Sequence, residues 1–145
     1  MTGTAHKPIL FLPHFLYWAT LTAMTDHRKQ LGALGERLAG RYLVQQGYKI
    51  VARNWRCPEG ELDLVAQKGE ELVFVEVRTR RGTRLGSPEE SITAAKQARL
   101  IQLAQAFLAE YNDPDCAWHI DVVAVVLNRQ GAVQRLTHIE YAIGE

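Results

Sequence analysis

A helix-forming segment between two strand-forming segments constrains the fold of this chain most. Residues 87–90 (Ser-Pro-Glu-Glu) form a capping box that predicts a helix start. An apolar stripe follows as far as Tyr111, before residues 112–114 (Asn-Asp-Pro) end the helix. The flanking segments 72–78 and 118–127 are apolar and rich in Val. Since strands joined through a helix run parallel with a right-handed crossover, the sequence predicts a mixed sheet.

The remaining segments give the predicted order α-β-β-β-α-β-β. Apolar residues recur every three or four positions over 31–46, which predicts a helix that Gly47 ends. Alternating or apolar segments separated by turn residues predict a three-stranded meander and one final strand. These strands are expected at 48–55, 61–66, 72–78 and 133–143, in addition to the strand at 118–127. The predicted fold class is α/β, with a mixed central sheet and helices packed against it.

Composition excludes several classes of protein. The chain has 145 residues, of which 47% are hydrophobic and 23% charged, so it can bury a core as a single domain. Its net charge is +1, and no uncharged apolar run is long enough to span a membrane. Cys57 and Cys116 fit no metal-binding spacing and are too few for a disulfide framework, so we expect a cytoplasmic protein.

Residues 1–25 differ in kind from the rest of the chain. They hold one of the seventeen Lys and Arg residues and none of the sixteen acids. Their apolar run resembles the core of a secretory signal, but no clean small-x-small cleavage site ends it. Because a typical soluble helix start follows Met24, we favour translation from Met24 over a signal peptide. We therefore expect residues 1–25 to be a leader outside the fold and 26–145 to be a single domain.

Two acidic residues stand in apolar strands that one turn joins. Alternation along a strand puts Asp63 on the face of Glu61, and Glu76 on the face of Arg78. The hairpin can place Asp63 beside Glu76. Burying an ionised carboxylate is costly unless it is paired or binds a metal, so two adjacent acids indicate a cation between them. Oxygen ligands from two carboxylates suit Mg²⁺ in phosphoryl chemistry.

The spacing of Asp63 and Glu76-x-Arg78 resembles the PD-(D/E)xK nuclease signature, with Leu62 in place of proline and Arg78 in place of lysine. Longer stretches are similar to the YraN family of small bacterial proteins, over nearly all of residues 30–143. These stretches are 35–36, 47–48, 53–56 (Arg-Asn-Trp-Arg), 60–64, 74–80 and 96–100. The resemblance implies a restriction-endonuclease-like fold, similar to that of Holliday-junction resolvases, and hence a nuclease-like domain over 26–145.

Carried over residue by residue, the resemblance implies that Asp63 and Glu76 bind Mg²⁺ or Mn²⁺ and that Glu36 is a third acid. Arg78 departs from the pattern, because a guanidinium stays charged and cannot act as a base, although it can hold a phosphate. Lys96 falls within the apolar arc of the second helix, about two turns from its start, and can supply the missing lysine. The predicted catalytic residues are therefore Glu36, Asp63, Glu76, Arg78 and Lys96.

Each of these side chains also has a purely structural interpretation. The acid pair could belong to an ion cluster, the lysine could extend along the core edge toward solvent, and the other acids could be solvated surface charges. The residues concerned are Asp63 and Glu76 with Arg53 and Arg78, then Lys96, Glu36 and Glu61. His119 is expected to be a satisfied polar side chain, and Asp121 to support the site or pair with an arginine.

A basic loop beside the predicted site holds four arginines within seven residues. Positive charge without local compensation binds phosphates and positions a duplex without reading its sequence. The predicted nucleic-acid contacts are Arg53, Arg56, Arg80, Arg81, Arg84 and Arg99.

Three functions agree with this pattern. The first is a Mg²⁺-dependent endonuclease that hydrolyses phosphodiesters in structured or branched DNA. The second is a non-catalytic nucleic-acid-binding module, because a fold does not determine an activity. The third is an interaction subunit that recruits a DNA-processing protein. A branched substrate would favour a homodimer with two sites.

Overall fold

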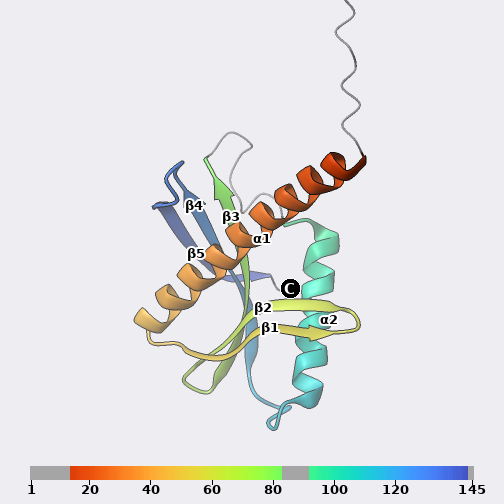
Figure 1. Ribbon diagram of the computed structural model, residues 1–145. Coiled ribbons are helices and arrows are strands. Elements are labelled where there is room, and N and C mark those ends of the chain that lie inside the picture. Colours follow the sequence, from red (N-terminus) through yellow and green to blue (C-terminus); the bar gives the residue numbers. More distant parts are fainter. Residues whose placement is uncertain (1–13, 83–91, 144–145) are drawn as a thin grey trace, which may run out of the picture. The chain divides into compact units, whose positions relative to one another are not determined.

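A computed structural model of the chain shows the predicted order of elements (Figure 1). The structure describes residues 14–82 and 92–143, with side chains from residue 26 onward. The elements are α1 (His14–Gln45), β1 (Lys49–Cys57), β2 (Gly60–Lys68), β3 (Glu71–Arg81), α2 (Ala94–Glu110), β4 (Trp118–Leu127) and β5 (Val133–Ile143).

The chain divides into two units, with the boundary between Gln30 and Leu31. The second unit contains the whole sheet, α2 and residues 31–45 of α1. The predicted leader boundary after residue 25 falls within α1 and stays a prediction. No helix in the described part of the chain has the length and apolar character needed to cross a membrane.

The end of α1 is fixed by a glycine, as predicted. Gly47 has a φ of 91°, a backbone conformation that favours glycine. The N–H of Gly47 donates to the carbonyl of Val44, and the N–H of Tyr48 donates to that of Leu43. These two bonds form a Schellman motif, which satisfies carbonyls at the helix end and directs the chain into β1.

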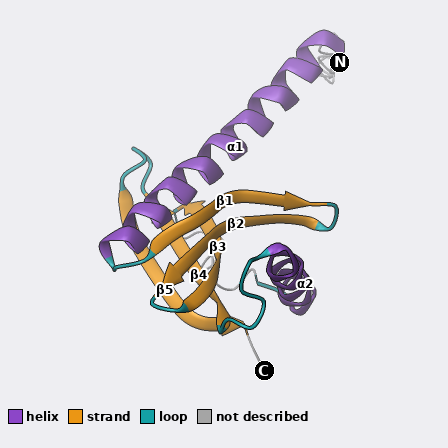
Figure 2. Cartoon of the chain, turned by 90° about the horizontal axis from the view of Figure 1, so that it is seen from below, coloured by secondary structure: helices purple, strands orange, loops and turns teal. Residues whose placement is uncertain are grey.

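The sheet has five strands in the order β1-β2-β3-β4-β5 (Figure 2). β1, β2 and β3 form an antiparallel meander, β4 runs parallel to β3, and β5 pairs with β4 antiparallel. The parallel β3–β4 pair, with α2 between its strands in the sequence, confirms the predicted mixed sheet. The observed β1, β2 and β3 are longer than predicted, because the pairing of β1 with β2 extends close to their turn and β3 pairs with β4 as far as Arg81.

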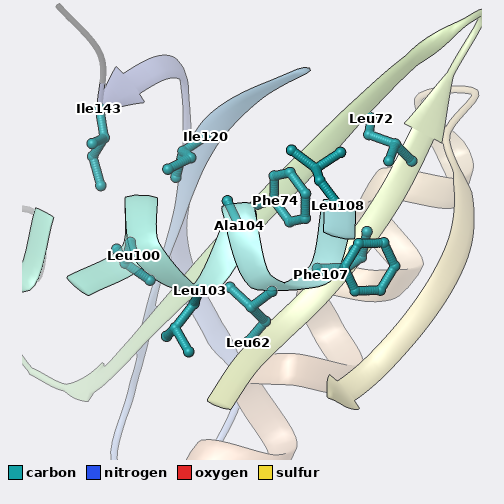
Figure 3. Close-up of a cluster of buried hydrophobic side chains, with 11 residues drawn as sticks. Leu62, Leu72, Phe74, Leu100, Leu103, Ala104, Phe107, Leu108, Ile120 and Ile143 are labelled. Atoms are coloured by element: carbon teal, nitrogen blue, oxygen red, sulfur yellow. The ribbon is translucent and has the colours of Figure 1, made fainter. Parts of the chain in front are cut away.

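Each face of the sheet has its own hydrophobic core. Phe74 and Ile120 face the apolar side of α2, where Leu100, Leu103 and Phe107 are buried (Figure 3). On the other face, residues 31–45 of α1 cover a second cluster. That cluster includes Ala39, Leu43, Leu64, Val73, Val75, Val123 and Val125. The sheet is therefore the middle layer between α2 and the C-terminal part of α1.

The start of α2 differs from the prediction. The predicted capping box at 87–90 lies outside the described residues, but Ile92 and Thr93 are not helical. Thr93 is the N-cap, with its side chain accepting from the N–H of Lys96, 3.2 Å away. A second N-cap residue six positions downstream of Ser87 thus begins the helix. Lys96 consequently lies in the first turn of α2 and not about two turns in.

Candidate active site

The candidate site lies where strands β2 and β3 separate. Their last described pair is Leu64 with Val75, and Asp63 and Glu76 occupy the next position. Asp63 Oδ2 accepts a hydrogen bond of 2.8 Å from the N–H of Val77. The Asp63 carboxylate therefore replaces a backbone carbonyl as the partner of the Val77 N–H at the end of the ladder. Asp63 and Glu76 lie next to each other, as strand alternation predicted.

Burial and charge act together on the Asp63 carboxyl. Desolvation, followed by the charge of Glu76, raises its pKa from 3.8 to about 8, and the bond from Val77 opposes this shift. The carboxyls of Asp63 and Glu76 are close enough to share a hydrogen bond. Glu76 is itself buried. Without a cation, the pair therefore favours a state in which Asp63 holds a proton at neutral pH.

Two cationic side chains approach Glu76. Lys96 Nζ lies 3.4 Å from Glu76 Oε1, and Arg78 Nε lies 3.6 Å from the same oxygen. Arg78 Nε is buried and forms no hydrogen bond within the described part of the chain. Lys96 comes from the first turn of α2, where the helix dipole disfavours a positive charge, so Glu76 is the group that stabilises it there. Both predicted cations therefore lie at the acid pair.

Glu36 reaches the site from α1, and the preceding glycine allows this. A Cβ atom on Gly35 would lie 1.7 Å from Thr79 Oγ1 and 2.8 Å from Thr79 Cβ, so only glycine lets α1 approach β3 so closely. Burial, and then the charge of Glu61, raises the pKa of Glu36. The charge of Glu36 in turn raises the pKa of Asp63. Glu36 is thus part of the same electrostatic group.

Asn54 is a member of the site that the sequence analysis did not single out. With its amide nitrogen turned toward the acids, it donates 2.9 Å hydrogen bonds to Glu36 Oε2 and Glu61 Oε1. Its φ of 49° is in the left-handed region, where asparagine is among the few tolerated residues. The only hint in the sequence was an asparagine inside a segment predicted to be a strand, where this residue is uncommon. Asn54 links the acid from α1 to the acid at the start of β2.

The residues present suit a hard divalent cation. Asp63 and Glu76 provide oxygen donors in a partly buried position, and burial together with their mutual repulsion raises the pKa of Asp63. A divalent cation between them would remove that repulsion and release the proton. Mg²⁺ commonly binds through one or two carboxylates and keeps several waters, so this pair is sufficient for such an ion.

Comparison with known sequences identifies the family. The model of the uncharacterised protein family UPF0102 matches residues 35–125. The chain belongs to the UPF0102 family. A UPF0102 protein of Roseiflexus castenholzii is 50% identical over 123 residues, covering 84% of this chain and 99% of the relative. One from Beutenbergia cavernae is 53% identical over 109 residues, covering 75% and 92%, respectively.

UPF0102 membership confirms the resemblance to the YraN family and its restriction-endonuclease-like fold. We call the point where β2 and β3 separate, with Asp63 and Glu76 side by side, the Asp63–Glu76 fork. The matched range begins at Gly35 and contains this fork and Lys96. It therefore includes every residue that we predicted to be catalytic, whereas β5 lies beyond it.

The arginines predicted to contact nucleic acid lie on different elements. Arg80 and Arg81 continue β3 beyond Glu76, and Arg81 is exposed. Arg56 lies 3.5 Å from Glu61, while Arg99 is exposed on α2 close to Gly60. Two further residues are Arg53, which lies against Gly40 of α1, and Arg84, which lies outside the described residues.

Asp121 contacts two histidines. Its side chain is fully buried on β4, within reach of His119 and His138. His138 Nε2 lies 2.7 Å from Oδ2, and His119 Nε2 lies 3.1 Å from Oδ1. His138 could not be identified from the sequence, because a histidine in an exposed-looking segment gives no signal of a buried partner.

Proposed function

We propose that this protein is a metal-dependent endonuclease that hydrolyses phosphodiesters in structured or branched DNA. The observation that carries the proposal is the position of Lys96 beside the Asp63–Glu76 pair. Two acids and a lysine are the groups that the PD-(D/E)xK signature uses, although here the lysine comes from another element. The substitution of Arg78 for the signature lysine therefore need not remove the chemistry.

Each residue of the site has a role in this proposal. Asp63 and Glu76 would hold Mg²⁺ or Mn²⁺, which when bound supplies Lewis-acid activation of water and phosphate. Lys96 would orient the attacking water and exchange its proton, since a lysine, unlike an arginine, can act as a base. Arg78 would bind a phosphate oxygen as charge develops on it. Glu36 would hold Asn54 and add negative charge near the cation.

Arginines beyond the fork support nucleic acid as the substrate. Arg80 and Arg81 follow Glu76 along one strand, so a phosphate backbone that meets them would pass the acid pair. Such contacts select a charged backbone and its shape, not a base sequence. We expect a branched substrate to engage two copies of the chain, which makes a homodimer, and we expect a DNA-processing protein as a further partner.

The two cysteines bear on the proposed cellular location of the protein. Cys57 and Cys116 are both free and partly buried. Free thiols without a disulfide framework fit a reducing compartment, so the proposed place of action is the cytoplasm.

The test is cleavage of a labelled four-way junction and of a linear duplex of the same sequence, with Mg²⁺, Mn²⁺ or EDTA. We expect cleavage of the junction only with metal, and none by Glu76→Gln, which keeps the shape of the side chain but removes its charge. Salt-dependent binding of the junction without cleavage in any metal would contradict the nuclease and favour the non-catalytic binding module. Absence of both would favour an interaction subunit.

A further inference from the structure

A second cluster of metal-ligating side chains lies between β4 and β5. We infer that Asp121, His138 and Glu140 form a binding site for a divalent transition metal of the Zn²⁺ class. One ligand atom from each residue lies within 4.8 Å of the other two. The cluster belongs to different strands from the Asp63–Glu76 fork and has no part in the proposed phosphodiesterase chemistry.

An irregularity in strand pairing builds this cluster. Ile120 pairs with Ile143, but Val122 pairs with Ile139, so three residues of β5 face one residue of β4. That single residue is Asp121. Tyr141, inside the bulge, has a φ of 51°, and its N–H donates to Asp121 Oδ1 over 2.9 Å instead of joining the ladder. The bulge therefore turns the backbone of β5 toward a buried carboxylate.

The Asp121 carboxylate is held with one oxygen directed at His138. Oδ1 accepts from the N–H of Tyr141 and lies 3.1 Å from His119 Nε2. Oδ2 lies 2.7 Å from His138 Nε2. His119 is nine-tenths buried, its Nδ1 has no hydrogen bond within the described chain, and its ring stacks on Tyr141. Asp121 thus has one oxygen fixed by its neighbours and the other paired with His138, where a metal ion can replace the shared proton.

The other two ligands are also held by outer partners. Tyr42 Oη lies 3.1 Å from His138 Nδ1, on the side of the ring opposite Asp121. Tyr48 Oη donates to Glu140 Oε1 over 3.2 Å. Metal-ligating histidines generally hydrogen-bond through the nitrogen that does not bind the metal, and ligating carboxylates are themselves hydrogen-bonded. All three candidate ligands therefore have the supporting partner that a metal site requires.

The donor set selects the class of metal. An imidazole nitrogen with two carboxylates suits Zn²⁺ and its neighbours, whereas Mg²⁺ prefers oxygen ligands alone. Glu140 is exposed while Asp121 is fully buried, so an ion can enter from solvent. Three protein ligands leave one position of a tetrahedral ion for water or a small anion.

The experiment is a Co²⁺ titration of the full chain, followed by its visible absorption. The background carries Asp63→Asn and Glu76→Gln, so that the Mg²⁺ pair contributes no ligand and the result is independent of the proposed nuclease. We expect one equivalent of Co²⁺ with the intense absorption of a four- or five-coordinate ion. Zn²⁺ should displace it, and excess Mg²⁺ should not.

Variants locate the ion. Because Glu140 is exposed, Glu140→Gln leaves the fold intact, and we expect it to lower Co²⁺ affinity by more than about tenfold. Tyr48→Phe should lower it by about tenfold through the lost outer hydrogen bond. The matched control is Glu110→Gln, an exposed acid at the end of α2, which should change nothing. Equal affinity in Glu140→Gln and Glu110→Gln, or equal displacement by Mg²⁺, would overturn the inference.

Discussion

The β2–β3 fork and the β4–β5 bulge each bury a carboxylate in the same sheet. The groups that surround the two carboxylates differ. At the fork, Asp63 meets Glu76 and receives one backbone N–H. At the bulge, Asp121 is fully buried and meets two imidazoles and a backbone N–H. The first environment favours a protonated acid, and the second surrounds the carboxylate with hydrogen-bond partners.

The difference shows how one sheet can hold acids for two purposes. A buried acid pair is unfavourable for the empty protein, which agrees with the proposed cation site. A buried acid with imidazole and N–H partners is stable in the empty protein, and it can bind a metal in exchange for the proton on its histidine partner. The partners of each carboxylate therefore separate a site that is unfavourable without a cation from one that is stable without it.

The largest expected effect concerns catalysis. Lys96→Ala should lower Mg²⁺-dependent junction cleavage by about 10²–10⁴-fold, because the variant loses the titratable group at Glu76. Binding of the junction, measured by fluorescence anisotropy, should change little. Lys49→Ala, at the exposed start of β1, is the matched control and should keep full activity. Full cleavage by Lys96→Ala would show that Arg78 suffices or that the role lies elsewhere.

Opposite changes in stability are expected for the two aspartates at pH 9. Asp63→Asn should raise the free energy of unfolding by a few kcal/mol, because asparagine keeps the bond from Val77 and removes a buried charge that Glu76 repels. Asp121→Asn should lower it by about 3 kcal/mol, because its buried donors lose a charged acceptor. Urea denaturation of both variants measures the two changes, and equal signs would break the comparison.

The pH dependence of stability follows from the same carboxyl. The pKa of Asp63 is about 8 in the folded chain, against an ordinary 3.8, so the folded chain binds more protons between these values. Stability contributed by protonated Asp63 is therefore fully present below pH 4 and lost as the pH rises through 8. Urea denaturation of wild type and Asp63→Asn from pH 5 to 9 should show this slope only in wild type. The same slope in both would assign it to other groups.

Packing between α1 and β3 should be sensitive at one glycine. Gly35→Ala should destabilise the protein by about 1–3 kcal/mol and weaken cleavage, because its Cβ would overlap Thr79 and move Glu36. Gly32→Ala is the control: it has nothing within 4 Å of its Cβ and should gain up to about 1 kcal/mol from helix propensity. Thermal unfolding of both variants measures the difference. A neutral Gly35→Ala would mean that α1 does not need this close approach.

The smallest effect is expected for DNA binding. Arg80→Ala with Arg81→Ala should weaken junction binding and reduce the slope of log affinity against log salt by about 2. Arg41→Ala, an exposed arginine near the end of α1, should leave the slope unchanged. Anisotropy titrations at several salt concentrations measure this. An unchanged slope in the double variant would remove these arginines from the proposed contact.

The fold could be predicted from the sequence because its signals are local. Strand alternation, the stop at Gly47 and the helix between β3 and β4 each depend on neighbouring residues. The start of α2 was predicted too early, because a second N-cap residue, Thr93, caps the described helix. The short hairpin between β2 and β3 fixes its own register, so Asp63 opposite Glu76 was also predictable.

Parts of both clusters depend on long-range geometry that no local pattern reveals. Asn54 joins Glu36 only because α1 packs over β1, and its left-handed backbone is not visible in the strand pattern. His138 pairs with Val123, which is two residues from Asp121 on the same face of β4, so this contact depends on the register between β4 and β5. The bulge that follows brings the N–H of Tyr141 to Asp121, which strand alternation alone could not predict.

The most direct test of the fork as a cation site is the titration of the Asp63 carboxyl, followed by ¹³C NMR with and without Mg²⁺. Without metal, we predict a pKa of about 8. Mg²⁺ should lower this pKa below neutrality, because the bound cation favours the ionised acid, and Glu76→Gln should lower it in the absence of metal. A carboxyl of Asp63 that titrates near its ordinary value without metal, or that Mg²⁺ does not affect, would contradict the account.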